Sequence, residues 1–218
     1  MFEQKKRAPR NRTIELNKKE IKQFRAKIIS AKNISGLDSI KNKTICGDTF
    51  EILKLLPEKS FDLLFSDPPY NLTKKFGKNT FKQTASDEYE NWLDSWLKNC
   101  VRLLKPAASV YICGDWRSSS AIERVGMNYF QLQNRITWER EKGRGAKANW
   151  KNASEDIWFF TVSDDYIFNL EAVKTKRKVL APYTENGKPK DWEKSGEGNF
   201  RLTHPSNVWT DLTVPFWS

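Results

Sequence analysis

Two hydrophobic patterns alternate along most of the chain, one typical of buried strands and the other of amphipathic helices. Short apolar runs that predict strands occur in KTICGD (43–48), FDLLFS (61–66), SVYICG (109–114), NRITWER (134–140) and DIWFFTVS with DYIFN (156–169). Helical spacing predicts helices over 49–56, where Pro57 follows, over 87–105, where Pro106 follows, and over 118–130. The apolar face of the 87–105 helix consists of Tyr89, Trp92, Leu93, Trp96, Leu97, Cys100, Leu103 and Leu104.

This alternation predicts an α/β fold built on an open, mostly parallel sheet of the Rossmann-like kind. The run at 61–66 is apolar on both faces, which is typical of a central parallel strand. Open α/β sheets bind their ligands at the carboxyl ends of the strands. Asp48 and Asp67 both fall at such ends, which makes them the first candidate site residues.

The flanks of the chain differ from the middle. Residues 1–40 are basic, and the apolar positions within 14–31 predict a helix in this segment. We expect it to form an arm that docks on the core, with contact to DNA as the more specific alternative. Residues 41–170 are predicted to form the core. Residues 171–218 are basic, rich in Gly and Pro, and contain several aromatic side chains. Their hydrophobic pattern has little periodicity, so we expect a loop-rich segment at the edge of the sheet.

Charge and composition narrow the function classes. With 38 basic and 27 acidic residues the net charge is +11, which favours a nucleic acid partner over the alternative of a merely solvated basic surface. No apolar run reaches the roughly 18 residues of a membrane span, and no apolar segment follows the basic N-terminus. The three cysteines are far apart in apolar contexts, as reduced core residues of a cytoplasmic protein are. The single histidine has no ligand-spaced neighbour, so no metal site is expected.

The strand at 61–66 runs directly into SDPPYN (66–71). This string resembles motif IV of the amino-methyltransferases of DNA, which move a methyl group from S-adenosylmethionine to an exocyclic base amine. The longer run ICGDTFEILKLLPEKSFDLLFSDPPYN (45–71) resembles the opening of the β-class members, and LLKPAASVYICG, NRITWER, ASEDIWFFTVSDDYIFN and NVWTD resemble their later segments. The resemblance covers about residues 41–211. A surface turn is the alternative for Asp-Pro-Pro.

The chemistry of amine methylation explains these residue types. The lone pair of an aromatic amine is conjugated with the ring, so catalysis needs acceptors for both N–H bonds. Asp67 offers a carboxylate, and the carbonyl of Pro68 offers a second acceptor, because the fixed φ angles of Pro68 and Pro69 hold that backbone without competing N–H groups. Tyr70 offers a ring on which a base flipped out of the duplex can stack.

The resemblance also implies a substrate and a cofactor. An Asp start of the motif is associated with adenine and a Ser start with cytosine, so Asp67 implies adenine-N6 methylation of double-stranded DNA, of the restriction–modification or orphan type. S-adenosyl-L-methionine is implied as the cofactor, with Asp48, its neighbour Thr49 and Asp67 as contacts. The alternative for Asp48 is a helix N-cap, and both roles can hold together.

The segment at 139–156 follows a predicted strand and interleaves basic side chains with a tryptophan. It is predicted to grip DNA phosphates near the flipped base, with a solvated loop as the alternative. Its candidate DNA-binding residues are Arg140, Lys142, Arg144, Lys147, Trp150 and Lys151.

The glycine-rich cofactor motif of the family, a strand ending in DPFxGxG or similar, has no match in this sequence. We therefore expect an incomplete methyltransferase fold with an exposed apolar sheet edge. A truncated gene product and a half that pairs with a second polypeptide, or forms a homodimer, are favoured over an unusually small enzyme. The alternative function is that of an inactive or split half, which binds DNA or a partner chain through its basic loops.

Overall fold

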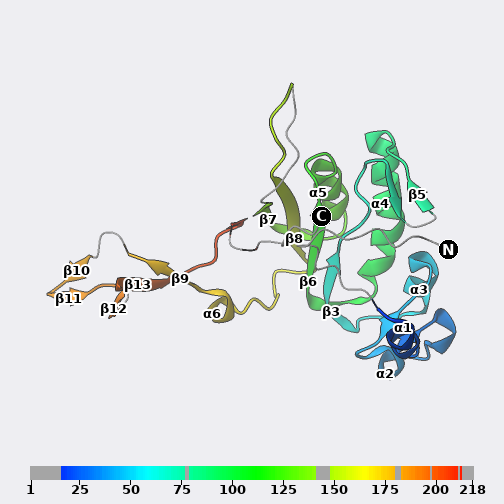
Figure 1. Cartoon of the computed structure of the whole chain (residues 1–218), viewed down its shortest axis with the longest axis horizontal. Helices are drawn as coiled ribbons and strands as arrows, with labels where there is room; N and C mark the ends of the chain where they lie inside the picture. The colour runs from blue at the N-terminus through cyan, green and yellow to red at the C-terminus, as the bar shows by residue number, and fades with distance from the viewer. Residues whose placement is uncertain are drawn as a thin grey trace.

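The computed structural model describes residues 16–76, 79–140, 148–179, 183–196, 198–210 and 212. Among these residues the largest sheet has five strands in the order β14-β7-β8-β6-β3 (Figure 1). Their bounds are β3 (Phe61–Ser66), β6 (Leu104–Gly114), β7 (Gln131–Glu139), β8 (Ser154–Thr161) and β14 (Val208–Trp209).

The strand directions confirm the predicted α/β fold with an open, mostly parallel sheet. Strand β3 runs parallel to β6, and β14 runs parallel to β7. Strand β8 is antiparallel to both of its neighbours, β6 and β7, so four of the five strands point the same way. The carboxyl ends of β3, β6 and β7 therefore meet at one edge of the sheet, where the amino end of β8 also lies.

Two helices, α4 (Ser86–Val101) and α5 (Ser119–Met127), cover one face of this sheet and enclose the core (Figure 1). The predicted apolar stripe of α4 is the buried one, as shown by the burial of Tyr89, Leu93 and Leu97. Helix α4 ends at Val101, whereas Pro106, the predicted stop, lies inside β6. The prediction placed that boundary too late because the apolar residues before Pro106 already belong to the strand.

Strand β3 is an edge strand of the described sheet, and the prediction that it is central with both faces buried is wrong for these residues. Its only described neighbour is β6. Leu63 and Phe65 point away from α4 and α5 and are 54% and 61% exposed. They line a largely apolar groove of about 560 Å³ on the uncovered face, together with Tyr111 and Phe159.

The N-terminal part consists of small elements beside the lower end of β3 (Figure 1). In chain order they are α1 (Lys18–Arg25), β1 (Ile28–Ile29), the 3-10 helix η1 (Ala31–Asn33), α2 (Leu37–Ile40), β2 (Thr44–Ile45) and α3 (Thr49–Leu55). Asn17 begins α1 with a reciprocal capping box that involves Glu20. No residue of α1 is buried, and β1 pairs in parallel with β2.

The cysteine prediction is confirmed in two places and wrong in a third. Cys100 and Cys113 are buried free thiols, whereas Cys46 is exposed. Cys46 follows the short strand β2, whose one partner among the described strands is β1, so its apolar neighbours in sequence do not imply burial in the main core.

The basic C-terminal segment contains more strand structure in its described part than the loop-rich prediction implied, and its β14 forms an edge of the main sheet. Beyond the short helix α6 (Leu170–Val173), β9 (Thr175–Lys178), β12 (Glu193–Ser195) and β13 (Gly198–Thr203) form an antiparallel sheet, and β10 (Thr184–Glu185) and β11 (Lys188–Pro189) form a hairpin. Together with the hairpin β4 (Lys74–Phe76) and β5 (Asn79–Phe81), these complete the described elements. The β9–β13 arm projects away from the core sheet (Figure 1, left).

Candidate active site

The Asp-Pro-Pro-Tyr corner opens into a cavity at the carboxyl end of β3. Asp67, Pro68, Pro69 and Tyr70 all line this cavity, which has a volume of about 620 Å³. Asp67 is exposed and Pro68 is buried, so the carboxylate faces the opening while the backbone beside it is enclosed. The Asp-Pro-Pro turn therefore borders a cavity rather than lying on a flat surface.

Helix α4 holds the backbone of this corner. The hydroxyl of Tyr89, which is 1% exposed, donates to the carbonyl of Pro69 over 2.9 Å. Among the described residues no donor bonds to the carbonyl of Pro68. The two proline carbonyls thus differ, because one is engaged by the core while the other remains available as an acceptor.

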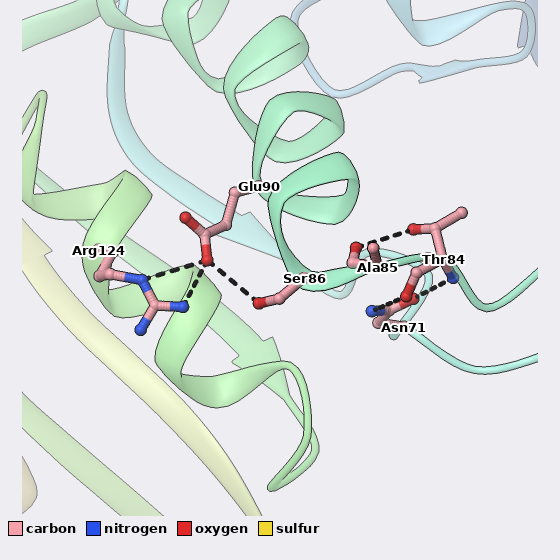
Figure 2. A network of polar contacts seen from close by, with 6 residues as sticks. All are labelled: Asn71, Thr84, Ala85, Ser86, Glu90 and Arg124. Carbon is pink, nitrogen blue, oxygen red and sulfur yellow. Dashed lines mark hydrogen bonds and ion pairs between the residues drawn. The ribbon is translucent and has the colours of Figure 1, made fainter.

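Asn71 fixes the chain where it leaves the corner (Figure 2). Its side chain accepts from the backbone N–H of Thr84 over 2.9 Å and donates to the Thr84 carbonyl over 3.0 Å, next to the start of α4. Its backbone N–H donates to the Ser118 hydroxyl over 2.9 Å. Glu90 pairs with Arg124 and so joins α4 to α5 in the same network. The corner is therefore tied to both helices of the core.

Tyr70 lies across the cavity toward β8. Its hydroxyl donates to Oε2 of Glu155 over 3.4 Å. Burial raises the pKa of Tyr70 well above its usual value, and the nearby carboxylates of Glu155 and Asp67 raise it further. Burial, with the charges of Asp67 and Glu155, also raises the pKa of the Cys113 thiol to about 11. Tyr70 is thus a neutral hydrogen-bond donor at any physiological pH.

An ion pair forms the wall of the cavity opposite the corner. Arg140 pairs with Glu155, and its guanidinium carbon lies 5.8 Å from the centroid of the Trp138 ring. The Glu155 side chain is only 13% exposed, so this pair is shielded more than a surface salt bridge. Of the three predicted DNA-binding residues that the structure describes, Arg140 is the one that lines the cavity.

Sequence reasoning missed several residues that line the cavity, among them Asp115 and Glu155. Asp115 follows the carboxyl end of β6, so the rule that selected Asp48 and Asp67 also applies to it. It is buried and accepts from the Ser118 backbone N–H over 2.9 Å. Glu155 is at the start of β8, and only the antiparallel direction of that strand brings it to this edge. The other residues that sequence reasoning missed are Leu72, Lys74, Trp138 and Asn152.

Asp48 and Thr49 do not line the Asp67 cavity. Both are exposed, and the Asp48 carboxylate accepts from the backbone N–H groups of Phe50 and Glu51, over 2.8 and 3.4 Å. This is the helix N-cap that the sequence offered as the alternative. A cofactor contact by Asp48 and Thr49 stays a prediction.

The remaining predicted DNA-binding residues divide into two groups. Trp150 and Lys151 are exposed, and the Trp150 side chain is 93% exposed. Lys142, Arg144 and Lys147 lie outside the described residues. In the described ranges no three metal-ligating side chains cluster, and no helix there is long and apolar enough to cross a membrane.

Comparison with known proteins agrees with the geometry. The profile of a DNA methylase family that covers N6 and N4 amino-methylation matches residues 61–215. The chain is 31% identical to the type II methyltransferase M.HpaI of Haemophilus parainfluenzae over 173 residues, which cover 77% of this chain and 49% of the relative. It is also 31% identical to the DNA adenine methyltransferase YhdJ of Escherichia coli strain K12, over 77% of this chain and 56% of the relative.

Among solved structures, the cytosine-N4-specific PvuII DNA methyltransferase aligns with 79% of this chain and 56% of its own, with 18% identity and a TM-score of 0.48. The chain spans about half the length of the curated relatives it matches.

Proposed function

Because the chain belongs to the family of DNA methylases that modify N6 and N4 amines, we propose that it takes part in site-specific methylation of adenine N6 in double-stranded DNA. The observation that carries this proposal is the Asp67 cavity, in which a carboxylate, a free backbone carbonyl and a partly buried tyrosine share one opening. Base methylation requires the target to leave the stack, and a cavity of about 620 Å³ is large enough to admit a single base.

Two acceptors hold the amine in the proposed reaction. The Asp67 carboxylate accepts one N–H bond and the Pro68 carbonyl accepts the other, which favours a tetrahedral nitrogen with its lone pair directed at the methyl donor. Tyr89 supports this arrangement by engaging the Pro69 carbonyl and so fixing the peptide that presents Pro68. Asp67 can then take up the proton that the amine loses, since it is the exposed carboxylate at the reacting atom.

The flipped base lies between Tyr70 and the wall formed by Arg140 and Trp138. The ring of Tyr70 offers a stacking surface, and the guanidinium of Arg140 offers donors to ring nitrogens of a purine. The excess of basic residues favours the DNA backbone as the surrounding ligand. Trp150 and Lys151 remain candidate DNA contacts beside the cavity, and Asp67 as first residue of the motif supports adenine over cytosine.

S-adenosyl-L-methionine would supply the methyl group. The described residues fit it only in part, because Asp67 lines the cavity whereas Asp48 and Thr49 lie elsewhere and the exposed edge of β3 leaves that side of the corner open. We therefore propose that a further polypeptide segment completes the cofactor site beside β3. Leu63 and Phe65, exposed on that strand, support this proposal because such a strand is otherwise an aggregation hazard.

The second candidate function is a DNA-binding half that is inactive until a partner chain or a second copy is present. The same exposed strand favours it. Calorimetric titration with S-adenosyl-L-methionine separates the two readings. Heat of binding from the chain alone favours an independent enzyme. Absence of heat at millimolar cofactor, with methyl transfer restored by a second polypeptide, favours the half.

Transfer of tritiated methyl groups to DNA, followed by nucleoside analysis, tests the reaction itself. We expect N6-methyladenine as the product. The proposed substrate is wrong if the label appears as N4-methylcytosine.

A further inference from the structure

Two arginines face each other across neighbouring strands of the projecting arm. Strands β9 and β13 pair antiparallel, and Arg177 lies directly opposite Arg201 in that register. Both side chains are exposed. Like charges directly opposite one another destabilise a strand pair, so their placement is unfavourable for the arm itself. A ligand that accepts hydrogen bonds from guanidinium groups would offset this repulsion.

The two arginines have different surroundings. Arg201 forms an ion pair with Asp191, with 3.3 Å between Nη1 and Oδ2, and both side chains are about half exposed. In the described part of the chain Arg177 has no acidic partner. Arg201 therefore fixes the position of the Asp191 carboxylate, while the guanidinium N–H groups of Arg177 are available to a ligand. Both belong to a shallow concavity of about 450 Å³ that is also lined by Leu202, Thr203, His204 and Ser206.

This combination of donors and an acceptor distinguishes between two ligands on DNA. A phosphate group carries only acceptor oxygens and negative charge, so the Asp191 carboxylate would repel it. A G·C pair, seen from the major groove, presents the guanine N7 and O6 acceptors next to the cytosine N4 amino donor. A free guanidinium beside a carboxylate matches that order of groups.

The shape and position of the arm agree with such a ligand. Proteins that read DNA with β-structure place strands in a groove, and the three-stranded sheet β12-β13-β9 extends from the core in a position to do so (Figure 1). Three of the four residues of β9 are basic, and β13 contributes Arg201. Alternate residues of a strand point to opposite faces, so Lys176 and Lys178 lie on the face opposite to Arg177. The Lys176 amine lies over the Phe200 ring, 4.4 Å from its centroid.

We propose that Arg177, Asp191 and Arg201 read a G·C base pair in the major groove of the DNA target. Arg177 donates to N7 and O6 of guanine, Asp191 accepts from N4 of cytosine, and Arg201 is a positioning residue that orients Asp191. This proposal rests on the proposed function, because it assumes that the chain binds double-stranded DNA.

Selection from a randomised duplex library by the full chain at physiological salt tests the proposal. We expect the wild-type chain to select a G·C pair at one position, and to bind the selected duplex roughly 10- to 100-fold more tightly than a copy with A·T there. Arg177→Gln should lower this ratio at least roughly threefold, as should 7-deazaguanine at that position in the DNA, which removes N7; the Asp191 contact to cytosine accounts for the discrimination that is left. Lys178→Gln removes the same charge from the opposite face of β9 and should leave the ratio unchanged.

Three results would overturn the proposal: a wild-type chain that selects no sequence, an Arg177→Gln variant that keeps the ratio, or an Arg177→Gln variant that binds all duplexes more weakly with a salt slope lower by about one. The last result identifies a phosphate contact instead. Methyl incorporation by the same preparations separates this failure from that of the proposed function. If methylation occurs but does not depend on Arg177, the G·C readout is wrong and the proposed function stands. If sequence selection depends on Arg177 but no methylation occurs, the proposed function is wrong and the G·C readout stands.

Discussion

The hydrogen bond from Tyr89 to Pro69 joins the core to the Asp-Pro-Pro-Tyr corner, and removing one oxygen atom tests its contribution. Tyr89→Phe removes only the hydroxyl, and the buried ring keeps its packing beside Phe81 and Trp92. A buried carbonyl that loses its donor costs about 1–3 kcal/mol. Because Pro69 is only half-buried and water can reach it, we expect the lower half of that range.

The expected loss corresponds to a fall in melting temperature of roughly 2–8 °C for a chain of this size. The more specific expectation concerns the corner itself. In Tyr89→Phe, hydrogen–deuterium exchange of the backbone amides of Asn71 and Leu72 should become faster, because these amides follow the released Pro69 peptide. Their hydrogen bonds are to the Ser118 hydroxyl and the Tyr70 carbonyl.

Tyr129→Phe is the matched control. Its hydroxyl donates to Asp94, which lies in α4 beyond Tyr89 and makes no hydrogen bond to the corner, so its removal should cost stability without releasing Pro69. The reasoning is refuted if Tyr89→Phe and Tyr129→Phe have the same exchange pattern at Asn71 and Leu72, or if Tyr89→Phe leaves the free energy of unfolding unchanged.

Three further predictions follow from the packing. Gly126→Ala would place a Cβ 2.4 Å from the ring of Phe160, so urea denaturation should show a loss of about 1–3 kcal/mol, and an unchanged midpoint would contradict this packing. Burial raises the pKa of Tyr89 to about 12, so the unfolded chain loses this proton first and the free energy of unfolding should fall between pH 10 and 12; a rise measured there would refute the direction. Replacing the exposed Leu63 and Phe65 by glutamate should change the stability of the isolated chain by less than about 1 kcal/mol while abolishing any assembly through β3, as size-exclusion chromatography would report; a large loss of stability would mean that they are already packed.

The sequence predicted the elements that carry strong periodicity. Helix α4 and strand β3 were found because sixteen and six residues of clear pattern leave little choice of secondary structure. The Asp67 site was found because its residues are consecutive in the sequence, so the motif can be recognised before the fold is known. The position of β3 at the edge of the described sheet was not predictable in the same way. A run that is apolar on both faces shows which surfaces a strand can bury, but not whether another strand pairs with it on each side.

The wall of the cavity shows a second limit. Glu155 and Arg140 are 15 residues apart in the sequence and meet because β7 and β8 pair antiparallel. No local pattern marks this pairing. The register that sets Arg177 against Arg201 is likewise a property of two strands far apart in the chain. Long-range pairing, rather than local propensity, thus decides which charged residues share a site.

Methyl transfer by an Asp67→Asn variant tests whether the Asp67 carboxylate acts on the amine. Asparagine keeps the shape of the side chain and one acceptor oxygen but removes the charge that would take up the amine proton. With DNA binding unchanged in a salt titration, the account predicts that N6-methyladenine formation falls by at least about 100-fold. Formation of N6-methyladenine at the wild-type rate would contradict it.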